Sequence, residues 1–440
     1  MRKTVMAIAC LAFQAVFLTG CSSDNILLPE VSETKKIANE YSIPLSDAVK
    51  IADAFMCNID KGTRTGRTIS KVEVKTSRAT RSGIGADTLL YLINYADNNG
   101  FALVSADKRL PAIYAISDEG HFEFADTLQN NGLAFFMKTV DNSINYSMEQ
   151  QADIIVPNDS VHWNKNYYDQ FKFTYNVIQP KLKRHMSRIS QGAPFNKYCI
   201  EFKIQRPTGC APIAVAALMS FYRWPESYKG HQYPWDEIVE GQNYDAIARL
   251  IYDLWDKDNL FISAEYDRTT GEFLGMAPEN KLCLINAFQH MGYIVKEGQN
   301  ALKSFNKDDM IEVLRRGYDN PPVGTPILAR GIEHINGKDK GGHVWVIDGA
   351  MWQHGKIGDG ITAPGIGSEP HYNPNMPMCL FHCVWGWGGS QNGFFNFDNN
   401  AIGGDPDFYG EYDSTEKGKS HLINLDLEYI GYIKRDLNRK

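Results

Sequence analysis

The sequence predicts an α+β fold, because amphipathic helices come first and strands later in its larger, C-terminal part. Helical apolar spacing occurs over residues 246–258 and 281–293, and the runs PILARG, HVWVIDGAM and LFHCVW follow with strand-like patterns. These segments belong to residues 179–440, which we interpret as one domain with a helical lobe and then an antiparallel sheet lobe. Residues 156–178 show no clear period and are interpreted as a linker.

Residues 44–155 predict a smaller α+β unit. Apolar residues at helical spacing follow the candidate N-caps Ser46 and Asp47. The Thr-, Arg- and Lys-rich residues 58–87 are interpreted as an exposed connection. The stretch TLLYLINYADNNGFALVSADKRLPAIYAIS then predicts a strand, an Asn-Asn-Gly turn and two further strands. Residues 129–151 predict a helix. With 440 residues and a 43% hydrophobic fraction, the chain can form two domains with full cores.

The N-terminus has the features of an export signal. Residues 1–20 contain a basic start and an apolar run that is too short for a stable membrane span. The sequence Leu-Thr-Gly-Cys that ends at Cys21 resembles a bacterial lipobox. It implies cleavage before Cys21 and a lipid on that residue, with residues 21–43 as a tether. We therefore expect a protein anchored in the bacterial cell envelope, at the outer membrane or surface. The alternative is an ordinary signal peptide with a chance cysteine.

The charge and cysteine content exclude several classes of function. The formal net charge is −7 and no long basic block occurs, so nucleic acid is not an expected partner. Six cysteines remain besides Cys10 and Cys21, and their scattered spacing does not indicate a disulfide framework. Cys379 and Cys383 flank His382, but the other half of a zinc site is missing. We expect no metal and no cofactor.

Cys210 is the candidate nucleophile. It opens a predicted helix in RPTGCAPIAVAALMSFYRWP, and Pro212 fits the first turn, where backbone N–H groups have no helical partner. A thiol at this end lies in the positive field of the helix dipole, which favours the thiolate. On position alone, a small core residue is the slightly better interpretation of Cys210.

Two further segments contain possible partners for this thiol. His343 lies at the head of an alternating strand, about 130 residues after Cys210, which is the order and separation of papain-like enzymes. Gln191 in SQGAPFN could combine its side-chain amide with the backbone N–H of Cys210 in an oxyanion hole. Trp385 and Trp387 in WGWGG could shield the pair from water.

In this order, these motifs resemble streptopain-type cysteine peptidases of the papain clan, and NNGFALVSADKRLPAIYAISDEG is similar to their inhibitory propeptide. The resemblance implies a papain-like two-lobed protease domain after a small α+β prodomain. It implies that Cys210 is the nucleophile, that His343 is the general base and then the acid, and that Gln191 with the Cys210 amide forms the oxyanion hole. Trp385 and Trp387 would form a wall around the pair.

The resemblance also implies that Gly342 lies beside bound peptide and that the prodomain inhibits the enzyme until it is removed. The cut is expected near Gln179, with Val177 as the apolar side chain that relatives prefer. Val384 departs from the family pattern, since many relatives have a polar residue there. Valine cannot hydrogen-bond to His343, so a backbone carbonyl or the Trp pair would have to orient the ring.

The main hypothesis is a secreted, lipid-anchored cysteine endopeptidase made as a zymogen, with peptides or proteins as substrates. The alternative is a surface binding protein on a catalytically impaired peptidase fold, which Val384 favours. A transpeptidase or amidase that acts on cell-wall peptides is a third possibility.

Overall fold

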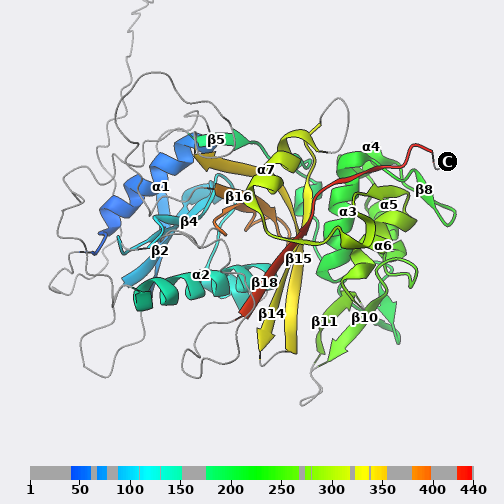
Figure 1. Ribbon diagram of the computed structural model, residues 1–440, viewed down its shortest axis with the longest axis horizontal. Coiled ribbons are helices and arrows are strands. Elements are labelled where there is room, and N and C mark those ends of the chain that lie inside the picture. The colour runs from blue at the N-terminus through cyan, green and yellow to red at the C-terminus, as the bar shows by residue number, and fades with distance from the viewer. Residues whose placement is uncertain are drawn as a thin grey trace, which may run out of the picture. The chain divides into compact units, whose positions relative to one another are not determined.

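The computed structural model describes most of the chain outside its N-terminus and a few connecting segments (Figure 1). The described residues are 41–60, 67–76, 88–108, 110–128, 130–150, 175–266, 273–278, 280–317, 323–335, 338–353, 379–397 and 424–438. The predicted signal peptide, Cys21 and most of the predicted linker lie outside them. No helix within these described ranges combines the length and the apolar character that a membrane crossing requires.

The N-terminal unit is a four-stranded sheet between two helices (Figure 1). Its elements are α1 (Leu45–Ile59), β1 (Ile69–Thr76), β2 (Thr88–Tyr95), β3 (Phe101–Ser105), β4 (Ile113–Ser117) and α2 (Asn131–Gln150). All five residues of β3 are buried, because Ala102 and Val104 pack with α1 while Phe101 and Leu103 pack with α2. A continuous apolar run such as FALVS therefore fits a strand that is covered on both faces.

Two predictions for this unit were wrong. The helix α1 begins at Leu45 directly after Pro44, which makes no side-chain cap, so Ser46 and Asp47 lie inside the helix. Proline suits this position because the first helical N–H groups have no partners. The predicted exposed connection contains β1, whose residues pair with β2 along its whole length. β1 is an edge strand with mostly exposed polar side chains, which explains why its sequence resembles a loop.

The next part of the chain forms the helical lobe. Its helices are α3 (Cys210–Tyr222), α4 (Trp235–Val239), α5 (Tyr244–Asp253) and α6 (Leu282–His290). Short hairpins surround them: β6 (Ile200–Glu201) with β7 (Ile204–Gln205), β8 (Ser227–Tyr228) with β9 (His231–Gln232), and β10 (Ile262–Tyr266) with β11 (Phe273–Pro278). α3 is central, since all its residues except Cys210 and Phe221 are buried. A helix that is apolar on every side is stable only when its neighbours surround it.

The sheet lobe follows. Its elements are α7 (Lys307–Arg316), β13 (Lys303–Ser304), β14 (Ile327–Ile335), β15 (Lys338–Gln353), β16 (Cys379–Val384), β17 (Gly393–Phe395) and β18 (Asn424–Ile430). β12 (Tyr293–Val295) and the C-terminal β19 (Ile433–Arg435) form a separate pair. Helices first and antiparallel strands later is the order that the sequence predicts, so the α+β class is confirmed.

The strands of the N-terminal unit and those of the sheet lobe form one continuous sheet. The strand order is β1-β2-β3-β4-β17-β16-β15-β14-β18-β13, all neighbouring strands are antiparallel, and the junction pairs Ile116 with Phe394 and Ala115 with Phe395. An aromatic cluster supports this junction, because the ring of Phe395 packs edge-on against that of Phe136 in α2, with 4.8 Å between the ring centroids. The N-terminal unit therefore joins the rest of the chain through shared backbone pairing and a shared core.

The last residues of the predicted linker form a strand instead. β5 (Tyr175–Ile178) pairs antiparallel with the end of β15. Just after it, the buried carboxylate of Asp348 accepts the backbone N–H groups of Lys181 and Leu182, at 3.0 and 2.9 Å. His382 also binds this carboxylate, with 2.6 Å between Nδ1 and Oδ1. The start of the protease domain is thus held on the sheet by pairing that the sequence of β5 alone does not indicate.

The junction leads to a first prediction. Phe136→Ala should lower the free energy of unfolding of the precursor by about 3–5 kcal/mol, because it leaves a cavity beside Phe395 and Phe397. Urea unfolding followed by tryptophan fluorescence measures this change. The exposed substitution Asn131→Ala on the same helix is the control. An unchanged stability of Phe136→Ala would mean that α2 does not pack on the sheet as described.

Candidate active site

Cys210 is the first residue of α3, as the sequence predicts. Gly209 precedes it with φ +82°, and a Cβ at that position would lie 2.4 Å from the carbonyl oxygen of Met276. Only glycine combines this backbone conformation with such a close approach. Cys210 is half-buried, and its Sγ accepts a hydrogen bond from the N–H of Val344 at 3.4 Å. The glycine turn therefore places the thiol at the helix N-terminus, against β15.

His343 lies on β15, next to that point of contact. It is buried, and its ring stacks on Trp345, with 6.2 Å between centroids and 12° between planes. Its Nε2 lies 2.9 Å from the carbonyl oxygen of Trp385. Because a carbonyl only accepts, Nε2 carries the hydrogen in this contact and Nδ1 carries the lone pair. Nδ1 has no hydrogen-bond partner among the described residues, which leaves it available as a base.

Cys210 is linked to the neighbourhood of His343 through the backbone, and no hydrogen bond among the described residues joins the two side chains. The sulfur binds the backbone of Val344, one residue after His343, while Nδ1 stays unpaired. Burial raises the pKa of the Cys210 thiol, and the backbone N–H groups of Val344, Cys210 and Ala211 lower it by a smaller amount. Burial also lowers the pKa of His343 to about 4. In this state both groups are neutral at pH 7, so the predicted thiolate is not formed.

The prodomain explains why the imidazole is buried. Gly132 in the first turn of α2 lies directly on it: a Cβ there would be 2.7 Å from Cδ2 of His343 and 2.5 Å from Cε3 of Trp385. Asn130 caps this turn, because its Oδ1 accepts the N–H groups of Gly132 and Leu133 at 3.0 and 3.1 Å. The positive end of the α2 dipole is therefore close to the ring and further disfavours its protonation.

More of α2 covers the neighbouring strands. The ring of Phe135 packs against Gly331, where a Cβ would lie 2.4 Å from the ring, and lies 6.1 Å from the Trp345 ring. Further along the helix, Lys138 forms an ion pair with Glu333 of β14. The helix thus lies along β14 and β15 from the histidine outward, so a polypeptide substrate cannot occupy the same surface.

Gln191 lies on the approach to Cys210. Its backbone carbonyl accepts the N–H of Thr208 at 2.9 Å, two residues before the thiol. The preceding residue, Ser190, forms an isolated bridge with Trp387, so the predicted wall residue adjoins the same segment. The structure therefore brings together the chain segments that contain Gln191, Cys210 and Trp387. The oxyanion role of the Gln191 side chain stays a prediction.

Gly342 is exposed next to His343. A Cβ at Gly342 would lie 2.4 Å from the carbonyl oxygen of Gly331 on β14, so close cross-strand approach is one reason for glycine here. Its role beside bound peptide stays a prediction.

Val384 does not orient His343. It is buried in an apolar cluster with Val344 and Val346, and it pairs with Val346 across β15 and β16. The Trp385 carbonyl binds Nε2 instead, which is one of the two alternatives that the sequence left open. The valine therefore removes no contact that His343 needs in this state.

Several residues at the site were not predicted. Trp345 could have been found, because it lies two residues after His343 on an alternating strand and so shares its face. Asn392 accepts the N–H of Trp385 at 3.2 Å from a position seven residues further along the chain. The contact with His343 of the turn that contains Asn130 and Gly132 could not be predicted, because the sequence of a helix does not show which distant residues it packs on.

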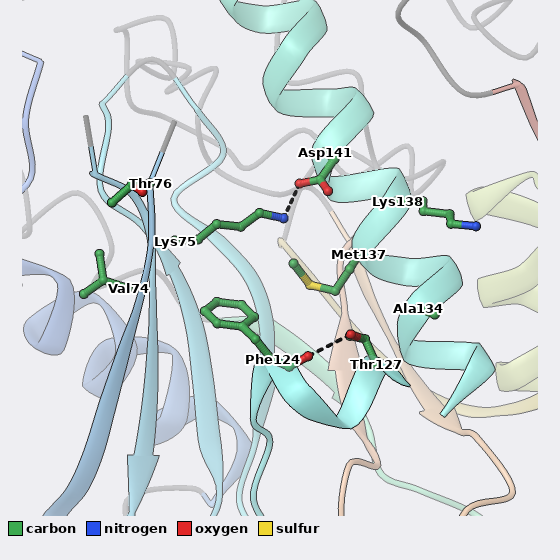
Figure 2. A pocket seen from close by; sticks show the side chains of 9 residues that line it. All are labelled: Val74, Lys75, Thr76, Phe124, Thr127, Ala134, Met137, Lys138 and Asp141. Carbon is green, nitrogen blue, oxygen red and sulfur yellow. Dashed lines mark hydrogen bonds and ion pairs between the residues drawn. The ribbon is translucent and has the colours of Figure 1, made fainter. Parts of the chain in front are cut away.

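A surface cavity of about 480 Å³ lies apart from these residues, in the prodomain (Figure 2). Its lining comes from β1, α2 and the 3₁₀ turn Phe124–Leu128, with Phe124 and Met137 among the side chains at its centre. Within the described ranges, no cluster of three or more His, Cys, Asp or Glu side chains could hold a metal ion. His382, which the sequence analysis did not assign to a metal site, binds Asp348.

A thiol at a helix N-terminus that contacts the backbone next to a buried histidine, with an N-terminal helix packed on that histidine, is consistent with a papain-like cysteine peptidase in its precursor form. The comparisons agree. Residues 189–395 match the model of the peptidase C10 family, and residues 34–144 match that of the Spi protease inhibitor. Residues 189–395 are thus recognised as a peptidase C10 domain, and an inhibitor domain of the Spi type precedes it.

The curated relatives are distant. Streptopain of Streptococcus pyogenes is 22% identical over 372 residues, which cover 75% of this chain and 79% of streptopain. The thiol protease/hemagglutinin PrtT of Porphyromonas gingivalis is 24% identical over 337 residues, which are 70% of this chain and 34% of that protein. A fragment of Prevotella intermedia prointerpain A is 16% identical with a TM-score of 0.45, and the match covers 82% of this chain and 99% of the fragment. The assignment rests on the family models.

The contact at Gly132 generates a second prediction. Gly132→Ala should force the start of α2 away from His343, because the added Cβ overlaps the imidazole and the Trp385 ring. We expect faster conversion of the precursor to the mature form, measured on gels over time, and faster labelling of Cys210 by a thiol reagent. The exposed neighbour Asn131→Ala should convert at the parent rate. Slower or equal conversion of Gly132→Ala would contradict the contact.

The neutral histidine generates a third prediction, on pH. The pKa of His343 is about 4 in the folded precursor and about 6.5 in the unfolded chain, so only the unfolded chain binds a proton between these values. This contribution to stability is complete above pH 6.5 and is lost as the pH falls toward 4. Between pH 7.5 and pH 5.0, the precursor loses about 2 kcal/mol of its free energy of unfolding from this source. Urea unfolding at both pH values should show that His343→Gln loses that much less stability than the parent. Equal losses would contradict a buried neutral imidazole.

Proposed function

We propose that this chain is the precursor of a secreted, lipid-anchored cysteine endopeptidase that cleaves polypeptides through Cys210 and His343. One observation carries the proposal: the Sγ of Cys210 lies on the backbone beside His343, and the Trp385 carbonyl occupies Nε2 so that Nδ1 is left as the base. The start of α3 and the strand that contains His343 are far apart in the sequence, and they are in contact at the residue after the histidine.

The reaction begins when α2 leaves the site. Water and substrate then reach His343, its pKa rises toward the ordinary range, and Nδ1 accepts the proton of the Cys210 thiol. The thiolate attacks the peptide carbonyl carbon and the carbonyl oxygen becomes an oxyanion. The N–H of Cys210 and the side-chain amide of Gln191 donate to that oxyanion. The imidazolium then protonates the leaving amine as the C–N bond breaks, which leaves a thioester on Cys210.

Hydrolysis of the thioester completes the cycle. Neutral His343 accepts a proton from a water molecule at Nδ1 while the water oxygen attacks the thioester carbon. The second tetrahedral oxyanion collapses, the C–S bond breaks, and the sulfur leaves as a thiolate with the imidazolium beside it. Throughout these steps the Nε2–H bond to Trp385 keeps one ring orientation, so the same nitrogen acts as base and as acid.

The prodomain is the proposed inhibitor of this reaction, and its removal is the proposed activation step. Gln179 is exposed at the point where the chain leaves β5, which suits a cut near that residue. Val177, the proposed specificity side chain, is paired with Met351 of β15. Cleavage there therefore requires β5 to separate from β15 first, since a protease binds its substrate as an unpaired extended segment.

The N-terminal sequence supports the proposed location. The basic start, the apolar run and the sequence Leu-Thr-Gly-Cys suit export followed by attachment of lipid to Cys21, in the outer membrane or at the cell surface. The alternative of an inactive surface binding protein has one observation in its favour, the valine at position 384. The orientation of His343 by a backbone carbonyl weakens that argument.

Self-processing provides a fourth prediction. The Cys210→Ala precursor should stay at full length, because no thiolate forms, whereas the parent converts to a smaller mature form on a gel. A peptide epoxide should label the parent at Cys210 only after the prodomain has been removed. Cys283→Ala, which removes a buried thiol from α6, is the matched control and should mature like the parent. Normal maturation of Cys210→Ala, or no labelling of the processed parent, would favour the binding protein.

A further inference from the structure

We infer that Asn392 is a positioning residue for the proposed reaction: its side chain holds the Trp385 backbone that orients His343 and links it to the segment that contains Gln191. The inference rests on the proposed function and adds a residue to it. Asn392 is 4% exposed and lies between the Trp385–Trp387 turn and β17. It touches neither the thiol nor the imidazole in any described contact, so its effect is indirect.

Both ends of the Asn392 side chain are engaged. Its Oδ1 accepts the N–H of Trp385 at 3.2 Å, and its Nδ2 donates to the carbonyl oxygen of Ser187 at 2.7 Å. Its backbone N–H donates to Gly389 at 3.1 Å, which closes the turn. A buried amide with both functions paired fixes the relative position of the groups that it joins.

The Oδ1 contact determines where the Trp385 carbonyl points. The N–H and the carbonyl of Trp385 belong to the two peptide planes on either side of its Cα. Asn392 holds the first plane. The second leads into Gly386, which has φ +76° and packs so closely on Ile213 of α3 that a Cβ would lie 2.9 Å from Cγ2. With both planes held, the carbonyl stays aligned with Nε2 of His343, 2.9 Å away.

The Nδ2 contact extends this support to the other side of the site. Ser187 belongs to the 3₁₀ turn Met186–Arg188, four residues before Gln191. The same segment reaches the turn again further on, where the Ile189 carbonyl accepts the N–H of Gly388 at 3.4 Å and Ser190 bridges Trp387. In this set of contacts, Asn392 contributes its side chain, whereas the other residues contribute backbone groups. It therefore connects the backbone that orients the base with the segment that carries the proposed oxyanion donor.

The residue at position 384 makes this indirect support necessary. Valine there supplies no hydrogen bond to the imidazole, so the ring orientation depends on one backbone carbonyl. Rotation of that carbonyl would release Nε2–H and allow the other tautomer or another ring orientation. Either change removes the lone pair of Nδ1 from the side of the thiol, which reduces the chemical step more than substrate binding.

The test uses Asn392→Ala and Asn392→Asp in the full-length precursor. Both are processed by parent enzyme immobilised on resin, which is then removed. Asp keeps an oxygen acceptor for the Trp385 N–H, whereas Ala loses it. The matched control is Asn259→Ala, which removes a buried Asn whose Nδ2 donates to the Asp253 carbonyl in the helical lobe. Readouts are kcat and KM on a fluorogenic peptide, and the pH dependence of Cys210 alkylation by iodoacetamide.

For Asn392→Ala we expect kcat to fall about tenfold or more with KM within about twofold, and the alkylation profile to move to higher pH. For Asn392→Asp we expect a smaller loss of kcat than in Asn392→Ala and a smaller shift of the profile, because the acceptor for the Trp385 N–H is kept while the donor to the Ser187 carbonyl is lost. Asn259→Ala should lower stability and leave the profile unchanged. If Asn392→Ala does not fold, Asn392→Ser, whose shorter hydroxyl cannot span both partners, takes its place in the same comparison.

Two results would overturn the inference: a parent-like alkylation profile in Asn392→Ala, or equal shifts in the Ala and Asp variants. The second would mean that the Oδ1 contact with the Trp385 N–H does not position the histidine. These outcomes differ from a failure of the proposed function, in which the processed parent itself neither cleaves the peptide nor shows activated alkylation of Cys210.

Discussion

The contact between Gly132 and the His343 ring is the constraint on which the latent state depends. Together with Trp345 and Trp385, Gly132 surrounds the imidazole with apolar atoms. An imidazole without water is neutral, and a neutral imidazole cannot stabilise a thiolate beside it. In the proposed mechanism, steric exclusion of substrate and loss of the charged pair therefore have one cause, and both end together when the helix leaves.

The strand β17 connects the prodomain with the turn that contains Trp385 and Asn392. β17 pairs with β4 of the prodomain, and the turn that leads into β17 contains Trp385 and Asn392. Phe395 of β17 packs on Trp385 at 5.0 Å as well as on Phe136 of α2. Removal of the prodomain thus unpairs an edge of the sheet directly next to the turn that orients the histidine. The hydrogen bonds of Asn392 lie wholly within the protease part, so they can persist after that step.

The parts of the site that the sequence predicted are those encoded locally. The start of α3 at Cys210 follows from an apolar helical run after Gly209, and the strand that contains His343 follows from its alternation. The elements that the sequence failed to predict have a different origin. β1 and β5 have polar or short sequences, and both are strands because a neighbouring strand offers them hydrogen bonds. The N-cap prediction at α1 failed because proline is compatible with the first turn and competes with a polar cap.

By itself, the sequence determined the order of the two units, the residue types of a cysteine peptidase and the position of the thiol at a helix N-terminus, since these depend on local pattern and spacing. The burial of the imidazole, its cover by Gly132 and its hydrogen bond to the Trp385 carbonyl come from tertiary contacts alone. The physical reason is distance along the chain. Protonation, occlusion and orientation depend on which remote groups come within a few ångströms, and no local pattern encodes those neighbours.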